Sequence, residues 1–144
     1  MILNNIKTPN QLMEYMQNNL QYGFVAKNKI YLDNNPNFQK DMDKYYKLSS
    51  PARLIKSGYG VCWDFCELQR AFFKANNIPY ECYFIHSFKN RVEGGPTHSF
   101  TLFYANEKCY WFEFSWQSNR GIWQFENKQQ ALKKIIGKSE AKRS

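Results

Sequence analysis

The period of the hydrophobic pattern changes at residues 76–79, and this change limits the possible folds more than any other feature of the sequence. After it, residues 80–86 show the two-residue period of a strand, with apolar side chains on both faces, so we expect an internal strand. Before it, apolar side chains recur at the spacing of one helical face, at Val61, Phe65, Leu68, Phe72 and Ala75. Helices followed by a block of antiparallel strands predict an α+β fold.

Local signals place a helix near the N-terminus. Thr8 is a suitable cap, Pro9 suits the first turn, and Gln11 stands at the capping-box position. We expect this helix to end at about Asn19.

Three shorter elements precede the central helix. Residues 24–32 can form a hairpin that turns near residue 28, and residues 38–46 have helical spacing. Ser50 followed by proline indicates the start of a third helix, which Gly58 ends.

The second half of the chain predicts antiparallel strands. Residues 98–104 and 109–116 are joined by the tight turn 105–108, which makes them a hairpin. A flexible glycine-containing loop over residues 89–96 precedes the hairpin, and a short strand at residues 121–125 follows it.

The chain has 144 residues, which suits one domain. Asn127 caps a last helix. We expect a single domain over residues 1–137 and a flexible C-terminal tail over residues 138–144.

Charge and cysteine content narrow the choice of partner and compartment. The net charge is +8, but the lysines are scattered, and the only dense basic run lies at residues 133–143. Because the lysines are scattered, we do not expect nucleic acid as a partner. We do not expect a membrane as a partner either, because no apolar run approaches 18 residues. The four cysteines follow no disulfide framework, so we expect free thiols and a cytoplasmic protein.

Cys62 is the strongest candidate for a nucleophile. It stands in the first turn of the central helix, one residue round from the apolar face, where free N–H groups and the helix dipole favour a thiolate. Gly58 and Gly60 precede it, and we expect them to let a substrate carbonyl approach the backbone closely.

His98 and Glu113 are the candidate partners of this cysteine. The chain has two histidines, His86 and His98, and His98 opens a strand directly after the glycine loop. With the hairpin turn near residue 106, position 98 pairs with position 115, which makes Glu113 a neighbour of His98. A cysteine, a histidine and a carboxylate supply the nucleophile, base and orienting group of acyl transfer through a thioester.

Four short motifs carry a family resemblance. They are Gly60-Val61-Cys62-Trp63-Asp64-Phe65, Asn77-Ile78-Pro79-Tyr80, Thr97-His98-Ser99-Phe100 and Trp111-Phe112-Glu113-Phe114-Ser115-Trp116. With them the chain resembles the transglutaminase-like superfamily of papain-like cysteine enzymes, as a small bacterial-type single-domain member. The resemblance implies a nucleophile helix packed on an antiparallel sheet, with Cys62 as nucleophile, His98 as general base and acid, and Glu113 in the third position, where the family often has aspartate.

The other candidate residues have structural interpretations. Cys66, Cys82 and Cys109 fit small core residues, Asp64 fits a helix-dipole partner, and Glu67 fits a surface ion pair with Arg70. The tryptophans at 111, 116 and 123 suit either the core or the lining of a cleft.

A zinc site made of Cys62, Cys66, Cys82 and His86 is disfavoured, because its spacing lies on a long helix and a strand rather than on tight knuckles. We expect no metal and no cofactor.

The expected function is hydrolysis of a peptide or protein amide through an acyl-thioester on Cys62. The backbone N–H of Cys62 would be one oxyanion donor, and an upstream tyrosine or a tryptophan is possible for the second. Two alternatives stay open: a protein-glutamine transamidase, and a non-catalytic peptide-binding module of the same fold. We favour hydrolysis because the chain offers no further domain to dock an amine and exclude water.

Overall fold

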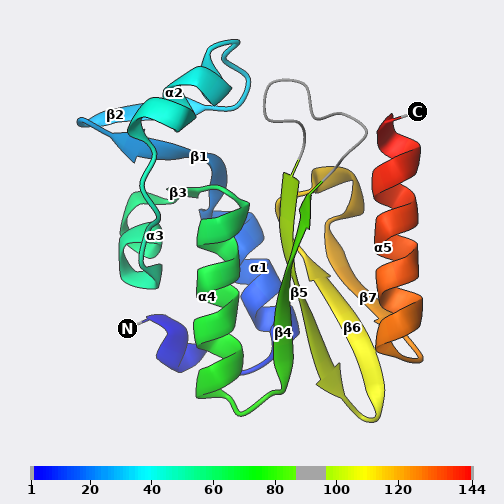
Figure 1. Ribbon diagram of the computed structural model, residues 1–144. Coiled ribbons are helices and arrows are strands. Elements are labelled where there is room, and N and C mark those ends of the chain that lie inside the picture. Colours follow the sequence, from blue (N-terminus) through cyan, green and yellow to red (C-terminus); the bar gives the residue numbers. More distant parts are fainter. Residues whose placement is uncertain (1, 87–96, 144) are drawn as a thin grey trace.

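A four-stranded antiparallel sheet stands at the centre of the computed structural model, which describes residues 2–86 and 97–143. Its strand order is β4-β5-β6-β7. The strands are β4 (Tyr80–His86), β5 (Thr97–Ala105), β6 (Lys108–Glu113) and β7 (Gly121–Phe125). Helices α1 (Pro9–Asn19) and α4 (Cys62–Ala75) cover one face, and α5 (Lys128–Arg143) covers the other (Figure 1).

A smaller sheet lies beyond α4, on the side away from the four-stranded sheet (Figure 1). It has the order β2-β1-β3. Its strands are β1 (Gln21–Ala26), β2 (Lys29–Leu32) and β3 (Tyr59–Gly60), and the helices beside it are α2 (Phe38–Tyr45) and α3 (Pro51–Ser57). Two 3₁₀ turns complete the described chain, η1 (Ile2–Asn5) and η3 (Gln117–Asn119).

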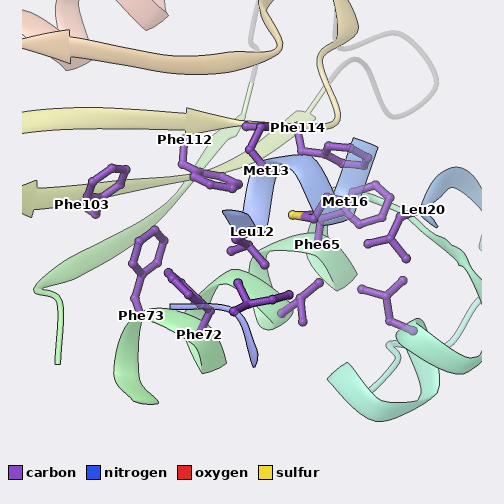
Figure 2. Close-up of a cluster of buried hydrophobic side chains, with 13 residues drawn as sticks. Leu12, Met13, Met16, Leu20, Phe65, Phe72, Phe73, Phe103, Phe112 and Phe114 are labelled. Carbon is purple, nitrogen blue, oxygen red and sulfur yellow. The ribbon is translucent and has the colours of Figure 1, made fainter. Parts of the chain in front are cut away.

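Two buried clusters hold these layers together. The larger lies between the helices and one sheet face, where side chains of α1 and α4 meet phenylalanines of the sheet region (Figure 2). Phe73 illustrates the packing, with its ring stacked 4.9 Å from that of Phe103. The smaller cluster lies under α5, where Ala131 and Ile135 pack near the fully buried Trp111. Burial of this apolar area is the main favourable term in folding.

The structure confirms the α+β class and most of the expected elements. The Thr8 hydroxyl accepts from the N–H of Gln11, and the Gln11 side chain accepts from the N–H of Thr8, which closes the expected capping box. Both expected hairpins occur. Each has two residues of positive φ in its turn, residues 27–28 in one and residues 106–107 in the other.

Strand β4 is an edge strand, which corrects the expectation that it is internal. Within residues 2–86 and 97–143 it pairs only with β5. Its apolar residues divide between two covered faces, since Tyr80 packs on the larger cluster while Tyr83 and Ile85 pack on the smaller one. Apolar residues on both faces of a strand thus reflect helices above and below it, not a strand on each side.

The last helix is longer than expected. Helix α5 continues through Gly137 to Arg143, beyond residue 137, where we expected the domain to end. One glycine weakens a helix by only about 1 kcal/mol, and lysines, alanine and arginine around it favour the helix. The ammonium of Lys138 lies 4.9 Å from the centre of the Trp123 ring, which ties this turn to β7.

None of the helices described in residues 2–86 and 97–143 is long and apolar enough to cross a membrane. The predicted loop at residues 89–96 lies outside the described residues.

Gly60 is required by the packing of the helix start. A Cβ on Gly60 would lie 2.6 Å from Leu54 Cδ1 and 2.9 Å from Asp64 Cβ, closer than real contacts allow. The close backbone approach that we expected at this glycine is made to Leu54 and Asp64 inside the protein. Gly60 lets α3 and the first turn of α4 pack against each other.

Two glycine substitutions test this packing. We expect Gly60→Ala to lower the free energy of unfolding by about 1–3 kcal/mol through overpacking. Gly137→Ala serves as the matched control, because its new methyl meets nothing within 4 Å on an ordinary helix. It should raise that free energy by roughly 0.5–1 kcal/mol. Urea unfolding monitored by circular dichroism measures both, and equal effects of the two changes would contradict the packing argument.

Candidate active site

The start of α4 presents Cys62 at the end of the molecule where β5 begins (Figure 1). Val61 is the N-cap residue and Cys62 is the first residue of the helix. The preceding Tyr59 and Gly60 pair in parallel with Gln21 and Tyr22 of β1, which fixes the direction in which the chain enters the helix. The thiol therefore lies beside the positive end of the helix dipole.

Asp64 holds this helix start in place from inside the protein. Its carboxylate accepts from the backbone N–H groups of Val61 and Ser49 and from the hydroxyl of Tyr46, each at 2.8 Å. The side chain is buried, and burial raises the pKa of Asp64 in spite of these three donors. As expected, Asp64 lies in the first turn near the helix dipole, but the sequence did not indicate that it also anchors the segment before α3.

His98 and Glu113 meet as the hairpin register predicted. The pairing of Thr101 with Phe112 places Glu113 diagonally across from His98, and His98 Nε2 lies 2.6 Å from Glu113 Oε1. Glu113 is 1% exposed, so its charge depends on protein donors. The indole N–H of Trp111 and the backbone N–H of Trp116 supply two of these donors, at 3.1 and 3.0 Å.

Cys62 is the second hydrogen-bond partner of the His98 side chain. Burial of the imidazole lowers the pKa of His98. The hydrogen bonds to Cys62 and Glu113 and the negative charges of both outweigh this effect and raise the pKa to about 9. The imidazolium form is therefore favoured at neutral pH. The structure thus brings the three candidate residues into one row, with His98 between the sulfur and the carboxylate.

Tyr22 also reaches this row, from β1. Its hydroxyl accepts a hydrogen bond from the backbone N–H of Cys62. Burial and the negative charge of the Cys62 sulfur raise the pKa of Tyr22 above its usual range, so the phenol keeps its proton. The position of Tyr22 depends on the parallel pairing of β1 with β3, for which the sequence has no local signal.

The remaining cysteines behave differently from one another. Cys66 and Cys109 are buried, as expected of core residues, whereas Cys82 is only partly buried. Cys66 and Cys82 both approach the hydroxyl of Thr101, at 3.8 and 3.6 Å. The hydrogen bond from Cys66, with help from Thr101 and the nearby Arg70, lowers the pKa of Cys82 to about 6. Cys82 therefore does not fit the expected role of a small core residue.

The other sequence interpretations can now be placed. Glu67 and Arg70 form the expected ion pair, at 3.5 Å and with both side chains partly exposed. Trp111 is fully buried and belongs to the core rather than to a cleft. Among the described residues, no group of three or more histidines, cysteines and carboxylates is placed to hold a metal ion.

A comparison with protein families matches residues 2–132 to the family described as a transglutaminase-like domain. The chain therefore belongs to the transglutaminase-like family, and its helices and antiparallel sheet form a papain-like α+β fold. No curated protein matches the chain, and no solved structure does.

The raised pKa of His98 predicts a pH dependence of stability. The pKa is about 9 in the folded chain, above the ordinary value of about 6.5, so the stabilisation is complete below pH 6.5 and is lost as the pH rises through 9. The free energy of unfolding should fall by up to about 3 kcal/mol across this window. Urea titrations at pH 6, 7.5 and 9.5 measure it.

Cys82 acts in the opposite direction over the same window, because its pKa is lowered to about 6. The titrations are therefore made in a Cys82→Ser chain. Adding His98→Gln should remove the decrease in the free energy of unfolding between pH 6 and 9.5. Adding Glu113→Gln instead should make this decrease smaller. A fall of unchanged size in Cys82→Ser/His98→Gln would assign the effect to another group.

Proposed function

We propose that the protein is a cysteine-dependent amide hydrolase of the peptidase or amidase type, with Cys62 as nucleophile. The observation that carries the proposal is the hydrogen-bonded row of Cys62, His98 and Glu113 at the start of a helix. A purely structural role gives no reason to bury Glu113 at 1% exposure and aim it at an imidazole that also contacts a thiol.

In the first half of the reaction the proton of the Cys62 thiol resides on His98 as the imidazolium, the form that is favoured at neutral pH. Ordinary thiols titrate near pH 8.5, so a base whose conjugate acid has a pKa of about 9 can accept this proton. The sulfur attacks the carbonyl carbon of the amide and a C–S bond forms. As the C–N bond breaks, the imidazolium of His98 gives its proton to the leaving amine, and an acyl-thioester remains on Cys62.

In this proposal Tyr22 and the backbone of Cys62 stabilise the oxyanion of this step. The Tyr22 hydroxyl already accepts from the N–H of Cys62, so its own proton is available to another acceptor. A substrate oxygen arriving here would accept a hydrogen bond from the phenol of Tyr22, and it would accept from the N–H of Cys62 only by taking the place of the Tyr22 oxygen on that group. Donors fixed in advance where charge develops contribute strongly to catalysis.

In the second half, water replaces the amine. His98, again neutral, takes a proton from the water, the C–O bond forms, and the C–S bond breaks to release a carboxylic acid and the thiol. Glu113 keeps the imidazole in orientation throughout. The His98 side chain is 19% exposed, which supports access of water to the thioester.

The proposed substrate is a peptide or protein amide, and the proposed compartment is the cytoplasm, where four free cysteines would stay reduced. Nucleic acid and membrane are not proposed as partners, and no cofactor is needed by the steps above.

The reaction is tested with a glutamine-containing peptide library and a labelled primary amine. We expect release of free acid or free amine that outpaces incorporation of the label, and complete loss of both in Cys62→Ala. Cys109→Ala is the matched control, because Cys109 is a buried thiol in the other core cluster, and it should retain activity. Faster amine incorporation would make the protein a transamidase. If these rates were the same in the wild type and in Cys62→Ala, no turnover would depend on the cysteine. The protein would then be a non-catalytic peptide-binding module.

The oxyanion role of Tyr22 predicts a specific kinetic pattern. Tyr22→Phe should lower kcat by about 100-fold, the usual cost of one oxyanion donor. Alkylation of Cys62 by iodoacetamide should stay within about twofold of wild type, because that reaction forms no oxyanion. Tyr31→Phe, on the neighbouring strand β2, should leave both rates unchanged. A parallel loss of alkylation and turnover would instead indicate that Tyr22 acts only by positioning the thiol.

A further inference from the structure

A cavity of about 410 Å³ lies beside the proposed nucleophile, between α4, the edge strand β4 and the segment after α2. The cavity adjoins the candidate site through chain neighbours, because Trp63 follows Cys62 and Ser99 follows His98, although neither Cys62 nor His98 lines it. Cys66, one helical turn beyond Cys62, lines it. The cavity therefore begins within one helical turn of Cys62 on α4.

The rim of this cavity is apolar and open to solvent. Leu48, Trp63 and Phe84 are 55%, 38% and 52% exposed, and all three line it. The ring of Trp63 lies 6.0 Å from that of Tyr46 and 6.2 Å from that of Phe84, which makes a continuous aromatic wall. Keeping large apolar side chains in water is unfavourable, and a gathered set of them marks a binding site.

The size and position of the cavity restrict its occupant. Sites for small ligands have about 300–1,000 Å³, so a volume of 410 Å³ suits a side chain rather than a folded partner. Helix α4 rises about 1.5 Å per residue, which puts Cys66 about 6 Å along the axis from Cys62. An extended peptide advances about 3.3 Å per residue. The side chain that enters thus belongs to a residue within about two positions of the reacting amide.

We propose that this cavity is a specificity pocket that binds an aromatic side chain of the substrate next to the amide attacked by Cys62. Ring stacking on Trp63 and Phe84 favours an aromatic group over an aliphatic one of similar area. The charged groups that line the cavity have both signs, because Glu67 is paired with Arg70 there, so the apolar rim sets the preference for an aromatic side chain. The proposal rests on the hydrolase function proposed above and names the class of its substrate.

Binding is tested first, without turnover. A Cys62→Ala chain is titrated with N-acetyl-phenylalanine amide while amide NMR shifts are followed, and N-acetyl-glycine amide is the comparison probe. We expect shifts at Leu48, Trp63 and Phe84 with the aromatic probe, and at least fivefold weaker binding of it after Phe84→Ala. Ile30→Ala is the matched control, because Ile30 is 50% exposed on β2, outside the cavity. It should change nothing.

A second arm blocks the cavity chemically. Cys82 lines the cavity, is less buried than Cys66 and Cys109, and has a lowered pKa, so in the Cys62→Ala chain iodoacetamide at pH 6.5 should alkylate Cys82 before the other two. The alkylated chain should lose binding of the aromatic probe, and a Cys82→Ser chain given the same reagent should keep it. Binding that survives both Phe84→Ala and alkylation would overturn the pocket.

Turnover then tests the role in selection. Peptides that differ only by Phe or Gly beside the cleaved amide should differ at least tenfold in kcat/KM, and Phe84→Ala should remove most of that difference. Cysteine-dependent cleavage that is indifferent to this residue and to Phe84→Ala would leave the hydrolase function standing and overturn the pocket. Aromatic binding without cleavage of any peptide would overturn both the hydrolase and the specificity role, and would leave a binding module.

Discussion

The buried carboxylate of Asp64 is the interaction on which the rest of the site depends. A charge removed from water is tolerated only when donors surround it, and Tyr46, Ser49 and Val61 provide three. These donors come from the helix start and from the segment that forms one wall of the apolar cavity. One side chain therefore sets both the direction in which Cys62 is presented and the shape of the neighbouring cavity, so a change at Asp64 would disturb both together.

Glu113 repeats this arrangement from the sheet. Its donors on β6 and just after it are held by packing around Trp111, while His98 approaches from β5. The two buried carboxylates thus fix the two halves of the site, one on the helix and one on the strands. The sulfur and the imidazole meet only where these halves face each other.

The sequence was informative wherever the signal was local. Caps, two-residue turns and apolar periods placed most helices and strands, and the hairpin register alone placed His98 beside Glu113. The errors share a different cause. Three features depend on contacts between residues that are distant in the chain. They are the edge position of β4, the packing around Gly60, and the contact of Tyr22 with Cys62. Periodicity carries no information about such contacts.

The short parallel pairing of β1 with β3 also affects when the site forms during folding. Tyr22 and Gly60 are about 40 residues apart in the chain, and so are Cys62 and His98. Contacts of such separation require large loops to close, and they form late compared with helices and hairpins. In a nascent or partly folded chain Cys62 therefore lies apart from His98 and Tyr22. The proposed nucleophile gains these partners only with the complete fold.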